Sequence, residues 1–154
     1  MSADITKDLS FEVIKDTYIG VFKKYLVIEG RARRREFWLF CIVNVILGLI
    51  PVIGWLVGLV TFIPSVAVGV RRLHDIDKSG KWMLLGLAPL VGVIFMIAGV
   101  FAGGGFGIIG FFSVLILLGS IGAAVIFIIW AAKEGTHGKN SYGPDPKSGS
   151  KSRK

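Results

Sequence analysis

The sequence predicts an all-α membrane protein, with four transmembrane helices arranged as two hairpins after an interfacial amphipathic helix. Two stretches carry no formal charge, residues 37–70 and 82–132, and they are 34 and 51 residues long. One helical crossing takes ~20 apolar residues, so each stretch can cross twice. The charges lie in residues 1–36, 71–81 and 133–154, and each of these segments is net basic. Because short basic segments stay on the cytoplasmic side, we expect both termini there.

The amphipathic helix is predicted within residues 1–30. Apolar side chains recur there at three- and four-residue spacing from Phe11 to Tyr25, and charged side chains such as Lys15 and Asp16 fall between them. Such a helix can lie at the lipid headgroups or pack on the cytoplasmic end of the protein's own helices.

The first uncharged stretch must turn, because one straight helix over it would be roughly 51 Å long. Pro51 and Gly54 supply the break and give spans near 34–52 and 54–74. Trp55 then lies beside the outer turn, where indole rings favour the membrane interface. The alternative is a re-entrant hairpin, which enters and leaves on the same side and keeps the same sidedness for its flanks.

The second uncharged stretch divides at a cluster of glycines between residues 103 and 110. Glycine weakens a helix and offers turn geometry, so spans are expected near 82–102 and 109–132. The integral membrane domain therefore covers residues 31–146. Residues 147–154 are expected to form a flexible basic tail.

Three polar motifs flank these stretches: Gly-Arg-Ala-Arg-Arg-Arg-Glu-Phe-Trp at 30–38, Arg-Arg-Leu-His-Asp at 71–75, and Asn-Ser-Tyr-Gly-Pro-Asp-Pro at 140–146. In this order they resemble the domain-of-unknown-function 805 family, the YhaH-like small inner-membrane proteins of bacteria. The resemblance spans roughly residues 22 to 146. It implies a multi-pass protein of the bacterial inner (plasma) membrane whose molecular activity is not established.

The polar motifs also supply the candidate binding residues. Arginine holds phosphate or carboxylate through two parallel hydrogen bonds, which lysine does not reproduce. Glu36 and Asp75 are expected to pair with the arginines when no ligand is bound. The simpler explanation of all these residues is anchoring to anionic lipid headgroups or structural ion pairing. The predicted ligand-binding residues are Arg31, Arg34, Glu36, Arg71, Arg72, His74, Asp75, Asn140 and Asp145.

The expected function is non-catalytic binding, without cofactor or metal, of anionic lipid headgroups, a small anionic ligand or a protein partner, which can be a second copy. The sequence lacks a basic surface interleaved with aromatic residues, so no specific nucleic-acid partner is expected. One alternative is a small oligomeric transporter or channel subunit, although the spans lack the ionisable groups that ion coupling needs. The other is an enzyme acting on phosphate headgroups through His74 and Asp75, for which no serine or cysteine nucleophile is evident.

Overall fold

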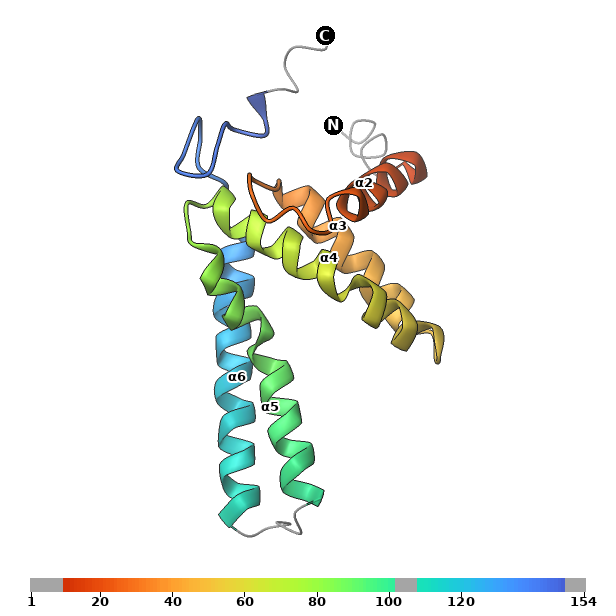
Figure 1. Ribbon diagram of the computed structural model, residues 1–154, viewed down its shortest axis with the longest axis vertical. Coiled ribbons are helices and arrows are strands. Elements are labelled where there is room, and N and C mark those ends of the chain that lie inside the picture. Colours follow the sequence, from red (N-terminus) through yellow and green to blue (C-terminus); the bar gives the residue numbers. More distant parts are fainter. Residues whose placement is uncertain (1–9, 102–107, 149–154) are drawn as a thin grey trace. The chain divides into compact units, whose positions relative to one another are not determined.

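The computed structural model describes residues 10–101 and 108–148, which are all helical apart from turns and loops (Figure 1). The chain forms two compact units, Met1–Gly80 with Glu134–Lys154, and Lys81–Lys133. The prediction of an all-α fold is confirmed for the described residues. The elements are α2 (Phe11–Lys23), α3 (Arg34–Gly48), α4 (Ile53–Asp75), the short 3₁₀ turn η1 (Gly80–Trp82), α5 (Met83–Phe101) and α6 (Ile108–Ala132).

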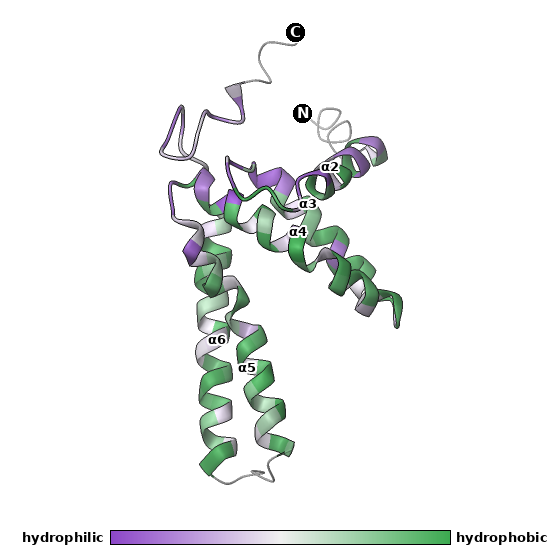
Figure 2. Ribbon diagram, in the orientation of Figure 1, coloured by the Kyte–Doolittle hydropathy of each residue, from purple (hydrophilic) through white to green (hydrophobic). Residues whose placement is uncertain are grey.

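The second unit is an antiparallel pair formed by α5 and α6, which are apolar along most of their length (Figure 2). Two glycines of α5 lie directly against serines of α6. A Cβ on Gly92 would come within 2.3 Å of Ser120 Oγ, and one on Gly99 within 2.5 Å of Ser113 Oγ. The small residues therefore set how closely the two backbones approach, as in other membrane helix pairs.

Three helical segments among the described residues are long and apolar enough to cross a membrane: Ile53–Asp75, Gly80–Phe101 and Ile108–Ala132. At 1.5 Å per residue they measure roughly 33–38 Å, against a hydrocarbon core of ~30 Å. α3 has 15 residues and ends at Gly48 instead of near residue 52. Its length of roughly 22 Å falls short of one crossing, so four spans do not follow from the helix lengths.

The turn between α3 and α4 is tight and explains why α3 ends early. The Ile53 N–H donates to the Pro51 carbonyl (2.7 Å), and Val52 between them has φ of 66°. A valine at positive φ is rare, because its branched side chain crowds the backbone. A Cβ on Gly54 would lie 2.4 Å from the Gly48 carbonyl oxygen. Pro51 therefore makes the turn as predicted, and Gly54 lets the two helix ends meet.

α2 packs on α3 through aromatic rings. Tyr18 stacks on Phe40 with centroids 5.0 Å apart, and Phe22 meets the same ring at 5.9 Å. The Tyr18 hydroxyl donates to Asn44 Oδ1 (3.0 Å). Lys15 lies on the exposed side of the helix. The amphipathic helix predicted within residues 1–30 is thus present from Phe11 to Lys23 and uses its apolar side against α3; residues 1–9 lie outside the described residues.

Candidate functional site

The three polar motifs meet at the C-terminal end of α4. The Asp75 carboxylate accepts hydrogen bonds from Arg31 Nε (2.9 Å) and Arg72 Nη1. The Asp75 carbonyl accepts from the N–H (2.8 Å) and the hydroxyl (3.1 Å) of Thr136. We call segments 30–36, 71–75 and 134–148 together the polar clasp. It joins the residues before α3, the end of α4 and the segment after α6.

Arg31 is the centre of the polar clasp and uses all five of its N–H donors within the chain. Besides the bond to the Asp75 carboxylate, Nη1 donates to the carbonyls of Gly138 (2.7 Å) and Gly143 (3.4 Å). Nη2 donates to the carbonyls of Asp75 (3.4 Å) and Thr136. These contacts give Arg31 a structural role within the chain, and its predicted ligand-binding role stays a prediction. Arg31 holds the segment after α6 against α4.

His74 and Asn140 also have structural partners. Asn140 Nδ2 donates to the His74 carbonyl (2.8 Å) and to Thr136 Oγ1 (2.9 Å), and its Oδ1 accepts the Tyr142 N–H (2.9 Å). The His74 and Tyr142 rings stack with centroids 3.9 Å apart. His74 Nδ1 lies 3.2 Å from the Gly30 carbonyl oxygen. Because a carbonyl oxygen can only accept a hydrogen bond, Nδ1 is the donor and carries a proton. Both predicted site residues hold the polar clasp together.

Arg71 and Glu36 link the last turn of α4 to the first turn of α3. Arg71 Nη1 lies 2.9 Å from Glu36 Oε1, and the Arg71 carbonyl accepts the Ala32 N–H (2.9 Å). The expectation that Glu36 and Asp75 pair with the arginines is confirmed by this bridge and by those of Arg31 and Arg72. Arg71 is buried, and its Nε and Nη2 atoms have no hydrogen-bond partner among the residues that the structure describes.

Asp145 fixes the turn that ends the polar clasp. Its carboxylate accepts the N–H of Lys147 (2.8 Å) and of Gly138 (3.3 Å). These bonds lower the pKa of Asp145 below its ordinary value because they favour the ionised carboxylate, and the bond from Lys147 has the largest effect. The Ser148 N–H donates to the Asp145 carbonyl (3.0 Å). Two residues of the predicted flexible tail are therefore held in a turn, and 149–154 lie outside the described residues.

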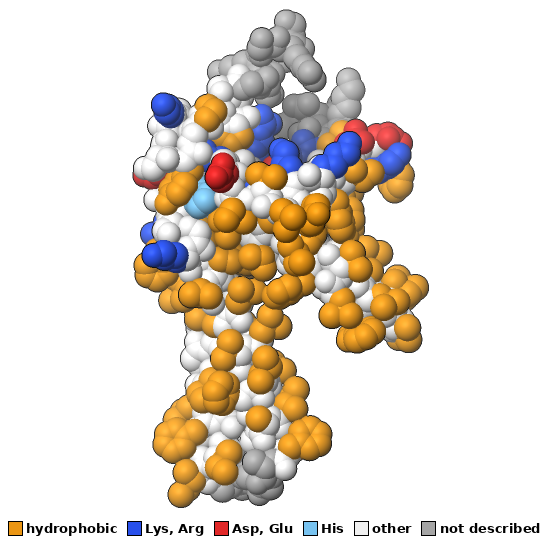
Figure 3. Space-filling view, viewed as in Figure 1, with side chains coloured by type: hydrophobic (Ala, Val, Ile, Leu, Met, Phe, Trp, Pro, Cys, Tyr) orange, Lys and Arg blue, Asp and Glu red, His pale blue; other side chains and the backbone are white. Residues whose placement is uncertain are grey.

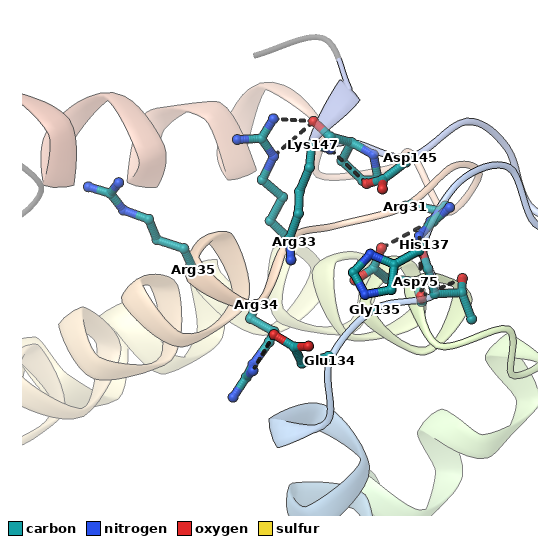
Figure 4. A pocket seen from close by; sticks show the side chains of 12 residues that line it. Arg31, Arg33, Arg34, Arg35, Asp75, Glu134, Gly135, His137, Asp145 and Lys147 are labelled. Atoms are coloured by element: carbon teal, nitrogen blue, oxygen red, sulfur yellow. Dashed lines mark hydrogen bonds and ion pairs between the residues drawn. The ribbon is translucent and has the colours of Figure 1, made fainter. Parts of the chain in front are cut away.

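A cavity of about 310 Å³ opens between the start of α3 and the segment after α6 (Figure 4). We call it the arginine pocket. Arg34 and Glu134 face each other across it at 3.7 Å, with 45% and 67% of their side chains exposed, so the pair is loose. Arg33 Nε donates to the Pro146 carbonyl (3.0 Å). The lining residues are Arg31, Arg33, Arg34, Arg35, Asp75, Glu134, Gly135, Thr136, His137, Asp145, Pro146 and Lys147.

The predicted site residues therefore separate into two groups. Four of them line the arginine pocket: Arg31, Arg34, Asp75 and Asp145. The other five lie elsewhere in the polar clasp: Glu36, Arg71, Arg72, His74 and Asn140. A second cavity of about 300 Å³ lies between α2 and the start of α3, and Lys24, Arg33, Arg35 and Glu36 are among its lining residues. Arg33 and Arg35 thus stand between two cavities.

Sequence reasoning missed several lining residues. Arg33 and Arg35 belong to the arginine run at 30–38, and that run is the sequence signal for them. Glu134, His137 and Lys147 follow the last uncharged stretch without any recognisable spacing. Across residues 10–101 and 108–148, no three His, Cys, Asp or Glu side chains come together as metal ligands.

Residues 25–144 match the profile of a family described as protein of unknown function (DUF805). The chain is 33% identical over 145 residues to inner membrane protein YhaI of Escherichia coli (strain K12). It is 34% identical over 148 residues to inner membrane protein YhaH of the same organism. Each alignment covers 86% of this chain and 97% of the relative. No solved structure matches the chain.

Proposed function

Starting from the DUF805 family, to which this chain belongs, we propose that this multi-pass inner-membrane protein binds the phosphate groups of anionic lipids in its arginine pocket, without catalysis. The family and the inner membrane agree with the resemblance and the localisation that the sequence predicted. The observation that carries the binding proposal is the arginine pocket.

The contacts of the polar clasp support placing all three basic segments at one membrane surface. Arg31, Asp75 and Thr136 touch one another, and residues in contact cannot lie on opposite sides of a bilayer. An even number of crossings therefore separates each from the next, which fits two hairpins. Because the three segments are net basic, we assign this surface and both termini to the cytoplasm.

The arginine pocket suits a phosphate better than a carboxylate-bearing protein segment. Its basic side chains, Arg33, Arg34, Arg35 and Lys147, outnumber the one loosely held acid, Glu134. The N-cap residue of α3, Arg33, makes no side-chain capping hydrogen bond in the part of the chain that the structure describes, and the first turn of a helix presents N–H groups that have no helical partners. Those N–H groups and the arginine forks favour a phosphate oxygen cluster. The inner-leaflet surface supplies such groups at high local concentration.

The same geometry leads us to propose a non-catalytic role. The His74 ring is stacked on Tyr142 and bonded through Nδ1 to the Gly30 carbonyl, and both Asp75 carboxylate oxygens are bound by arginines. A general base needs its carboxylate or imidazole within reach of a substrate proton. These two groups instead serve the polar clasp. The transporter or channel alternative stays a prediction, which a flux measurement in liposomes tests.

Lipid selectivity of the purified protein tests the binding proposal. Native mass spectrometry measures how much phosphatidylglycerol and phosphatidylcholine the protein retains. We expect the anionic lipid to be preferred and each of Arg34→Gln and Lys147→Gln to reduce the preference about fivefold, since a basic residue gains ~1 kcal/mol at an anionic surface. Lys139→Gln removes one exposed charge outside the pocket and is the matched control.

Two results would argue against lipid as the ligand. Equal retention of both lipids by the wild-type protein would remove the proposal. Alternatively, soluble glycerol phosphate at millimolar concentration could displace the lipid from the wild-type protein but not from Arg34→Gln. This result would mean that the pocket binds phosphate from a small soluble ligand and not from a lipid.

A further inference from the structure

We propose that the hairpin of α3 and α4 enters and leaves the membrane on the side of the polar clasp, and that its apolar tip, residues 49–56, is covered by the acyl chains of that one leaflet. The sequence left open whether this hairpin crosses. Four observations in the first unit favour the re-entrant form, and none of them depends on ligand binding at the arginine pocket.

The contact between α2 and α3 limits how deep α3 can reach. Tyr18 of α2 bonds to Asn44 of α3 (3.0 Å), and the exposed Asp16 lies within one turn of Tyr18. A short carboxylate side chain stays at water or headgroups, because an unpaired charge in hydrocarbon is costly. From Asn44 to the end of α3 at Gly48 the helix advances only ~6 Å. That is too little to cross a hydrocarbon core of ~30 Å.

The loop after α2 gives an independent estimate of how deep the start of α4 lies in the membrane. Tyr25, Leu26 and Ile28 border a cavity of about 200 Å³, whose other wall is α4 from Phe62 to Ala67. The exposed Glu29 follows this loop directly and belongs at the membrane surface for the same reason as Asp16. From residue 62 back to residue 53, where α4 begins, the helix covers ~14 Å. Half of the hydrocarbon core, one leaflet, is ~15 Å thick.

The tip itself has the surface of a lipid-embedded segment. Apart from the indole N–H of Trp55, residues 45–60 contain no polar side-chain group. Leu49, Val52 and Trp55 are 78%, 75% and 69% exposed. In the space-filling view the outer part of this hairpin shows apolar side chains, and the charged side chains of the unit gather at its other end (Figure 3). A contiguous apolar surface of this kind marks a membrane contact, whereas a turn emerging into water carries polar residues.

The turn backbone is also suited to a lipid environment. Irregular backbone is tolerated at membrane depth only where its polar groups find partners. Pro51 has no N–H, and four neighbouring N–H groups donate to carbonyls within the hairpin. These belong to Leu49 (3.2 Å), Ile50 (3.2 Å), Ile53 (2.7 Å) and Gly54 (2.7 Å).

The depth of Trp55 tests the proposal. The full chain with Trp38→Phe, Trp82→Phe and Trp130→Phe retains Trp55 as its only tryptophan. It is reconstituted in vesicles of phosphatidylcholine brominated at different positions along the acyl chain. We expect the strongest fluorescence quenching from bromines near the chain ends, at the bilayer centre. Strongest quenching from bromines near the ester groups would place Trp55 at a membrane interface and overturn the proposal.

A labelling experiment reaches the same question without removing tryptophans. In a Cys41→Ser background, Leu49→Cys is exposed to a membrane-impermeant maleimide before and after permeabilisation of the cells. We expect no labelling from either side, and labelling once detergent dissolves the membrane. Lys139→Cys in the polar clasp is the aqueous control. Labelling of Leu49→Cys from either face of the intact membrane would contradict the re-entrant hairpin.

Discussion

Arg31 and Asp75 form a buried ion pair between residues 44 positions apart, with Nε and Oδ1 at 2.9 Å and side chains 1% and 7% exposed. The pair closes the polar clasp, because Arg31 also bonds to three carbonyls after α6. A buried ion pair is weak evidence of net stability, but removing one member strands the other charge.

Asp75→Ala therefore strongly destabilises the first unit. The substitution leaves Arg31 and Arg72 buried without their shared carboxylate, and breaking a buried pair costs about 3–5 kcal/mol. Thermal unfolding in detergent, followed by protease sensitivity after α6, measures the loss. Glu12→Ala, which removes an exposed pair with Lys15, is the control and should change little. If Asp75→Ala were as stable as Glu12→Ala, the Asp75 carboxylate would not be what holds the polar clasp together.

Gly135→Ala tests the packing around the same carboxylate. A Cβ there would fall 2.1 Å from Asp75 Oδ2, and two arginines prevent the carboxylate from moving. Overpacking of this kind costs about 1–3 kcal/mol. Gly20→Ala in α2 meets open space and should be neutral or slightly stabilising. An unchanged melting temperature for Gly135→Ala would mean that the segment after α6 is not docked on Asp75.

Gly54→Ala tests the tight turn between α3 and α4. Its Cβ would lie 2.4 Å from the Gly48 carbonyl oxygen, which is backbone and cannot turn aside. Gly58→Ala, one turn further along α4, has nothing within 4 Å and is the matched control. We expect the yield of folded protein, measured by monodisperse size-exclusion chromatography, to fall for Gly54→Ala only. Similar yields would indicate that the two helix ends do not approach as described.

Much of this organisation follows from the sequence for physical reasons. Charge-free stretches predict membrane helices because a bilayer excludes charge, and the net basic character of the three flanking segments predicts that they share one membrane surface. The sequence could not tell Arg31 from Arg34. Both belong to one basic run, yet Arg31 lies in the extended segment after Gly30, at φ 80°, and is buried, whereas Arg34 begins α3 and is exposed. That difference depends on contacts with residues more than 100 positions away.

Other features lacked any local signal. Lys147 and Glu134 come to the arginine pocket only because the segment after α6 folds back over Asp75. α3 ends at Gly48 because the chain then enters the turn with Val52 at positive φ, and Gly48 packs against Gly54. The sequence does not mark this end, because similar apolar residues lie before and after Gly48. Hydropathy alone therefore could not place the end of α3.

The turn held by Asp145 should loosen in acid. Hydrogen bonds from Lys147 and Gly138 lower the pKa of Asp145 from 3.8, so its contribution to stability is present above that value and is lost as pH falls through the lowered pKa. Hydrogen exchange at the two N–H groups should stay slow at pH 5 and accelerate, relative to the intrinsic rate, only as pH falls below 3.8. Asp145→Asn should exchange fast at both pH values. Protection that is independent of pH would rule out the carboxylate as the acceptor.

We propose that the three polar segments form one clasp on the cytoplasmic side. Single cysteines at Glu29, Lys78 and Lys139, in the Cys41→Ser background, test it most directly with a membrane-impermeant maleimide on intact and permeabilised cells. We predict that all three are labelled only after permeabilisation. Labelling of any one of them in intact cells would contradict the claim, because that segment would then face the opposite side from its partners.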